Sequence, residues 1–168
     1  MRLTLALMGM AVWAGSALAD AKLYSNAKYG FSITVPPAIA EGWEEPDAGD
    51  GLRSHSADGK ADFVVWAGFL MDENGAKVKF ATEIKGRLES ETGSGAKITY
   101  QKVEKKWAAF SSLNGETILY ERAILSCKGG AIAAYRLQYP KAQKAAYDAV
   151  IEALNGSFID NQGCELKN

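Results

Sequence analysis

The pattern of apolar and polar positions predicts seven β-strands along this chain. The run from residue 29 to 36 alternates between apolar and polar positions until Pro36-Pro37 ends it. Strands are also predicted over residues 52–56, 61–70, 98–104, 107–113, 116–125 and 131–139, of which 61–70 is a continuous apolar run and 98–104 alternates only loosely. Tight turns separate several of these runs: Asp58-Gly59, Asn114-Gly115 and Gly129-Gly130. Strands joined by such turns pair antiparallel.

Two segments instead repeat their apolar residues with the period of a helix. The first covers residues 78–91, with an apolar stripe at Val78, Ala81, Ile84 and Leu88. Its charged positions are predicted to face water: Lys77, Lys79, Glu83, Lys85, Arg87 and Glu89. The second helix starts at Pro140 and ends near Asn155-Gly156. Its predicted core stripe is Tyr147, Val150, Ile151, Leu154 and Phe158.

The order of these elements indicates the fold class. The segment Phe63-Val64-Val65-Trp66-Ala67 is apolar at every position, which predicts a central strand covered from both sides. We therefore expect an α+β fold in which a mostly antiparallel β-sheet is sandwiched by two helices. A loop of about fourteen residues, rich in Gly, Pro and acidic residues, is predicted after Pro37.

The first nineteen residues follow a different pattern. Met1-Arg2 is a short basic start, residues 3–14 are largely apolar, and Ala17 and Ala19 stand at the positions that signal peptidase reads. The apolar run is shorter than the about 20 residues that span a bilayer. We predict a cleaved signal peptide at residues 1–19, one domain at residues 20–168, no stable membrane anchor and a periplasmic location. A retained N-terminal anchor or a buried helix is the alternative.

Charge and motif content exclude several function classes. The chain has 19 basic and 20 acidic residues, interspersed along its length. A nucleic-acid binder carries a basic patch or stripe, so we expect no nucleic-acid partner. The sequence has no glycine-rich phosphate loop, no zinc-ligand spacing and no paired catalytic carboxylates. We therefore predict no cofactor and no metal.

The chain has two cysteines, Cys127 and Cys164. In an oxidising compartment an even pair is usually bonded, so we predict a disulfide that ties the polar tail to the domain. A redox pair or a metal-binding pair is the alternative. Neither fits well, because the chain has no Cys-x-x-Cys and only one histidine.

The strand at residues 28–36, Lys-Tyr-Gly-Phe-Ser-Ile-Thr-Val-Pro, resembles the opening strand of PsbP-like domains, the fold of an extrinsic photosystem II subunit. Further segments are similar to uncharacterised exported proteobacterial proteins. These segments are Gly49-Asp50-Gly51, Asp58-Gly59-Lys60-Ala61, Thr99-Tyr100, the strand from Trp107 to Ser112, Tyr120-Glu121-Arg122, Leu137-Gln138-Tyr139-Pro140 and Tyr147-Asp148. The resemblance implies a mostly antiparallel sheet between helices and favours a binding or assembly module. It implies no enzymatic activity, and a fold does not fix a function.

His55 and the acidic loop are the residues to weigh for chemistry. Ser54 and Ser56 flank His55, but neighbours on a strand point to opposite faces, so neither serine is placed for a catalytic pair. Residues 41–50 bear a superficial likeness to a calcium loop, although they lack its alternating ligands and closing glutamate. We interpret His55 as an exposed strand residue and the loop as solvated.

A candidate binding patch consists of Trp43, Arg53 and His55. Arg53 and His55 lie on a strand between two Asp-Gly turns, and arginine and tryptophan often anchor interfaces. The alternative is that these are ordinary turns and no patch exists. Trp43 either covers the core as a lid or is an exposed contact residue.

These observations predict an exported, non-catalytic binding or accessory module for another envelope protein. The alternative is a periplasmic small-molecule or metal-binding protein that uses the Trp43 loop and the Arg53–His55 strand. The third hypothesis is an enzyme whose active site is assembled from scattered residues. We predict no catalytic residues.

Overall fold

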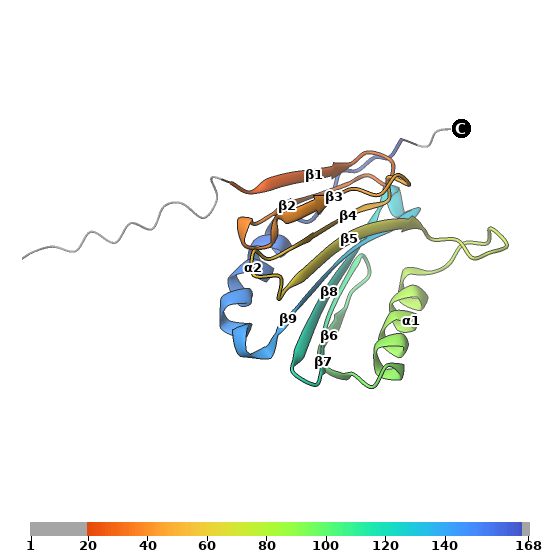
Figure 1. The fold of residues 1–168 in the computed structure, drawn as a ribbon. Coiled ribbons are helices and arrows are strands. Elements are labelled where there is room, and N and C mark those ends of the chain that lie inside the picture. The colour runs from red at the N-terminus through yellow and green to blue at the C-terminus, as the bar shows by residue number, and fades with distance from the viewer. Residues whose placement is uncertain (1–19, 166–168) are drawn as a thin grey trace, which may run out of the picture.

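The computed structural model describes residues 20–165, and the predicted signal peptide lies outside these described residues. Within them, seven strands form one antiparallel sheet (Figure 1). Their spatial order is β3 (Glu41–Glu44), β4 (Gly51–His55), β5 (Asp62–Phe69), β9 (Ala131–Pro140), β8 (Thr117–Ser126), β7 (Trp107–Asn114) and β6 (Lys97–Val103). Gly59 and Gly115 adopt positive φ in two of the tight turns, as the sequence predicts.

A smaller sheet of three strands lies beside the first in the described chain. It consists of β1 (Lys22–Asn26), β2 (Phe31–Val35) and β10 (Ile159–Asp160), with β2 in the middle. Ile159 pairs with Ser32 and Asp160 with Phe31, both antiparallel. The first and last strands of the described chain therefore belong to one sheet.

Helices and the small sheet cover the two faces of the large sheet (Figure 1). Helix α1 (Phe80–Gly93) lies on one face over a small core that contains Ile84 and Ala134. Helix α2 (Lys144–Ser157) and the small sheet lie on the other face over the main core, where Phe31, Tyr135 and Leu154 are fully buried. Neither of these helices in residues 20–165 is long and apolar enough to cross a membrane.

The α+β class, the mostly antiparallel sheet and the two helices are confirmed. The cover of the sheet differs from the prediction, because α2 shares its face with the small sheet. On the other face α1 packs over β7, β8 and β9 at Ala108, Ala123 and Ala134, and Val64 and Trp66 on β5 stay partly exposed. The prediction that β5 is covered from both sides is therefore right for one face and wrong for much of the other.

Three short strands and two side chains depart from the sequence analysis, and one of these side chains is Ala81, which is exposed although it belongs to the predicted apolar stripe. Strands β1 and β10 were not predicted, and β3 occupies part of the segment predicted as a loop. Arg87 was predicted to face water, but its side chain is 16% exposed and points at the sheet. Its guanidinium forms an ion pair with the buried carboxylate of Glu121, which the helix pattern alone does not predict.

The predicted disulfide between Cys127 and Cys164 is confirmed. The two residues are 37 positions apart, and their Cα atoms are separated by 5.0 Å. Backbone bonds hold the same tail, because the Asn161 amide donates to the Gly30 carbonyl at 2.8 Å and the Glu165 amide to the Ala27 carbonyl at 2.9 Å. The tail therefore packs against the β2 side of the molecule and the turn before β9.

Candidate binding site

Part of the large sheet remains open on the side where α1 lies. Antiparallel register places Arg53, Val64 and Arg136 in one row across β4, β5 and β9. The neighbouring row contains His55, Asp62 and Gln138, on the same face because side chains alternate along a strand. We call these six side chains, together with Trp66, the Arg53 face.

Two adjoining hollows lie on the Arg53 face. Their volumes are about 350 and 320 Å³, and both are lined by Arg53, Val64 and Arg136. Trp66 lines the smaller hollow, and His55 lines the larger. The floor combines guanidinium donors with apolar surface, and the carboxylates of Glu44 and Asp62 also line the larger hollow. Such a lining suits a group with both polar and apolar parts.

A buried ion network fixes one edge of this face. The side chain of Glu121 on β8 is 1% exposed and accepts Arg87 Nη1 at 3.0 Å and Arg136 Nη2 at 2.7 Å. Arg136 Nη2 also contacts Glu91 Oε1 at 3.1 Å, and Glu91 Oε2 accepts the Ser112 hydroxyl at 3.1 Å. The network therefore joins α1 to three strands of the sheet.

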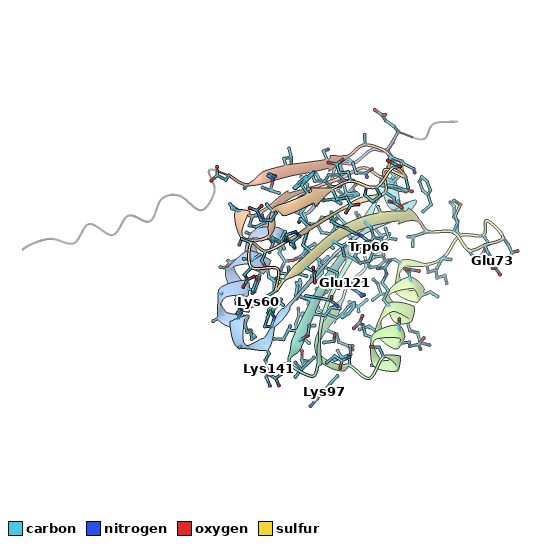
Figure 2. All side chains as sticks on the ribbon, viewed as in Figure 1. Lys60, Trp66, Glu73, Lys97, Glu121 and Lys141 are labelled. Atoms are coloured by element: carbon cyan, nitrogen blue, oxygen red, sulfur yellow. A yellow bond between two sulfur atoms is a disulfide. The ribbon has the colours of Figure 1, made fainter. Side chains whose placement is uncertain are left out.

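Trp66 packs against the two arginines of this network. The guanidinium carbons of Arg87 and Arg136 lie 5.1 and 5.9 Å from the Trp66 ring centroid, within cation–π range. Figure 2 shows Trp66 and Glu121 on the side of the sheet that faces α1. The two guanidinium groups contact the Trp66 indole, and the indole also lines the smaller hollow.

The two arginines on the floor of the hollows differ in their partners. Arg136 donates to Glu121 from Nε at 3.0 Å as well as from Nη2, so its charge is matched inside the protein. Arg53 is exposed and forms no ion pair or side-chain hydrogen bond with other residues in 20–165. Arg53 is therefore the cation of this face that is available to a ligand.

The serines beside His55 are engaged elsewhere. Ser54 Oγ donates to the Ile39 carbonyl at 2.6 Å, and Ser56 Oγ donates to Asp58 Oδ1 at 2.7 Å. Bonds from Ser56 and from the Lys60 amide lower the pKa of Asp58 below its ordinary value. His55 Nδ1 lies 2.8 Å from the Ser56 carbonyl oxygen. Within the described residues, neither the Ser54 nor the Ser56 hydroxyl therefore forms a hydrogen bond with the His55 imidazole.

Trp43 does not join the other two residues of the candidate patch. It lies on β3, next to a register shift between Glu41 and Glu44, and its ring contacts Tyr24 at a centroid distance of 6.4 Å. Lys22 Nζ lies 5.5 Å from the ring centroid, and the indole Nε1 donates to Glu45 at 2.9 Å. Trp43 covers the edge of the main core, while Arg53 and His55 face the opposite side of the sheet.

A third hollow of about 550 Å³ lies between α2 and the end of β2. Small apolar residues such as Ala149 and Ala153 line it, together with Asp20, the first described residue. It lacks the guanidinium donors of the Arg53 face. No group of three or more metal-ligating side chains gathers among the described residues.

Comparison with known proteins identifies the fold. No protein-family model matches the chain, and no curated protein matches it. The cyanobacterial PsbP protein CyanoP of Synechocystis sp. PCC 6803 is similar with a TM-score of 0.58 and 11% identity, over 91% of this chain and 98% of that one. The Ran-binding protein Mog1p of Saccharomyces cerevisiae is similar with a TM-score of 0.56 and 10% identity, over 87% and 97%. Likeness at this identity concerns the fold, and the chain has the PsbP-like fold that its opening strand predicted.

Proposed function

We propose that this protein is a non-catalytic binding or accessory module of the cell envelope, exported by residues 1–19, and that it contacts another protein through the Arg53 face. The observation that carries the proposal is the exposed Arg53, unpaired within residues 20–165, beside Val64 and Trp66 on paired strands. Arginine and tryptophan with apolar surroundings are the residues that anchor protein interfaces. A similar fold binds a protein in Mog1p, which supports this use of the fold.

Rigidity is the second argument for an interface here. The Arg53 face lies on paired strands, and the buried Glu121 holds Arg136 and Arg87 in place. A partner that docks on such a surface orders few side chains, so less conformational entropy opposes binding.

Site-specific photo-cross-linking in the periplasm of intact cells tests the proposal. A photoreactive residue at His55, which is exposed on the Arg53 face, should capture a discrete protein, and Arg53→Ala should reduce the adduct. The matched control is the same residue at Leu23 on β1, 68% exposed and on the small sheet, where no such adduct should form. Absence of any adduct from His55 under several growth conditions would contradict the proposal.

Export has its own test. The mature protein should be found in the periplasmic fraction, and its N-terminal sequence should begin at Asp20. Full-length protein that starts at Met1 in the cytoplasm would contradict the envelope location, whatever the Arg53 face binds.

A small carboxylate ligand is the second candidate occupant. The volumes of the two hollows, about 350 and 320 Å³, favour it because small-molecule pockets begin near this size. A ligand at a hundredfold excess over its dissociation constant should stabilise the fold by about 2.7 kcal/mol. Thermal shift against a panel of carboxylates, with Arg53→Ala as the control, should show this stabilisation, and a flat panel would remove this candidate.

A further inference from the structure

Strand β6 forms one free edge of the large sheet. It pairs with β7 on one side, and no strand of residues 20–165 pairs with its other side. A register shift between Ile98 and Tyr100 leaves the run from Tyr100 to Val103 in regular register. Backbone amides and carbonyls along such an edge can accept a further strand.

The other strand edges in the described chain are less suited to pairing. Strand β3 is joined to β4 with an irregular register, and β10 has two residues. Strand β1 is already tied to the residue before β3 and to the start of β4, since Lys22 Nζ donates to the Ala40 carbonyl at 3.1 Å and Tyr24 donates to the Gly51 carbonyl at 3.0 Å. Strand β6 carries no such ties.

The charge around β6 differs from that of the chain as a whole. Residues 97–106 include four lysines and one acidic residue, whereas the whole chain has a net charge of −1. Lys102 and Glu104 lie 3.5 Å apart with about half of each side chain exposed, so this pair is weak. Figure 2 shows Lys97, at the start of β6, at the margin of the molecule.

Exposed apolar side chains occur on the same strand. Tyr100 is 47% exposed and Val103 is 45% exposed, and their positions in the strand place them on opposite faces. Trp107 follows on β7, with Lys102 Nζ 5.2 Å and the Arg122 guanidinium 4.7 Å from its ring. A strand added to β6 would thus find apolar contacts on both faces and lysines beside them.

We propose that the β6 edge binds an extended acidic segment of another protein, which adds to the large sheet as a further strand. Acidic side chains of that segment match Lys97, Lys102, Lys105 and Lys106. The same lysines repel a second β6 edge, which argues against pairing between two copies of this chain. This site is separate from the Arg53 face and does not depend on the function proposed for that face.

The test uses a fluorescent peptide that alternates glutamate with valine, and the mature protein from residue 20. Fluorescence anisotropy should show saturable binding that weakens as salt rises. The double variant Lys102→Glu/Lys105→Glu should weaken binding by roughly tenfold or more, because like charges then face each other. Those amides of residues 100–103 that point away from β7 should become protected from hydrogen exchange when the peptide binds.

Matched controls separate this site from general attraction and from the Arg53 face. The double variant Lys77→Glu/Lys79→Glu makes the same change of charge on two exposed residues before α1 and should leave peptide affinity unchanged, as should Arg53→Ala. A peptide with N-methylated backbone amides should not bind, since strand pairing needs those donors. Equal binding of the N-methylated peptide, or of the natural peptide to the Lys102/Lys105 variant, would overturn the proposal. Concentration-dependent self-association without peptide binding would also overturn it, in favour of a second copy.

Discussion

Glu121 shows what a single residue contributes here. Strand alternation predicts that it points to the same face as Ala123, but an acidic residue on a strand is expected at the surface. In the structure it is fully buried, and Arg87 and Arg136 approach it from two other elements. Neither arginine is close to Glu121 in the sequence, so the network could not be predicted from local pattern.

Glu121→Gln should destabilise the protein by about 3–5 kcal/mol, because two arginines would be left without their buried counter-charge. Urea unfolding monitored by tryptophan fluorescence measures the change. The control is Glu116→Gln, which removes a carboxylate that is 86% exposed and 4.0 Å from Lys141. Equal losses for the two variants would show that burial of Glu121 contributes nothing.

Gly30 and Gly59 provide a matched pair of glycines. Both have positive φ, 68° and 65°, but a Cβ at Gly30 would overlap the Gly163 carbonyl oxygen, while a Cβ at Gly59 would contact nothing. Gly59→Ala should therefore cost about 1–2 kcal/mol from the backbone conformation alone. Gly30→Ala should cost more and should loosen the tail, which thermal unfolding and proteolysis of the C-terminus can measure. A smaller loss at Gly30 would contradict this packing.

At the scale of elements, the long strands and helices were predictable because their periods are clear over many residues. The short strands were not. Strand β10 has two residues and is a strand only because β2 lies beside it, and β3 is interrupted by a register shift around Trp43. The same limit applies to the candidate site. The sequence assigns Arg53 and His55 to one strand. It does not show that Trp43 lies on the other face, because that placement depends on the register shift between Glu41 and Glu44.

The open part of the large sheet is also a property of elements. Alternation in β9 places Arg136 and Gln138 on the face away from the core residues Tyr135 and Leu137. The sequence pattern therefore predicts that Arg136 and Gln138 share one face of the sheet. The sequence pattern does not predict where α1 lies on the sheet. The helix packs over β7, β8 and β9 and leaves Arg53 on β4 and Val64 on β5 uncovered, and the Arg53 face is open for that reason.

The link between β10 and the rest of the fold leads to a prediction for the disulfide. Replacing both cysteines, Cys127→Ser and Cys164→Ser, should lower the free energy of unfolding by about 3–4 kcal/mol, because a loop of 37 residues is no longer closed. Hydrogen exchange at the Asn161 amide should accelerate more than exchange in β8. Native protein should contain no titratable thiol after denaturation, and two free thiols would contradict the bond.

At the scale of the whole molecule, buried tyrosines make stability depend on alkaline pH. Burial, followed by the nearby Asp148 carboxylate, raises the pKa of Tyr139 to about 12. Burial also raises the pKa of Tyr24 and of Tyr135 above the ordinary value. Because the folded state favours the neutral phenol, this contribution is complete below about pH 10 and is lost as the pH rises toward about 12.

Tyr139→Phe should therefore make the alkaline loss of stability less steep, with little change near neutral pH. The phenyl ring can keep the stacked contact with Tyr147, whose ring centroid lies 4.7 Å away. Urea unfolding at a series of pH values up to about pH 11 gives the two slopes. Identical slopes for the variant and the parent protein would show that Tyr139 does not titrate with unfolding.

The position of β10 also determines when folding can finish. Its two residues complete the small sheet against β2, and the disulfide partner Cys164 follows them close to the end of the chain. A chain that crosses a membrane from its N-terminus presents β2 well before β10. If the protein is exported in this way, β2 must wait with one edge unpaired until residues 159–160 have crossed. The small sheet and the disulfide then form after the hairpins of the large sheet.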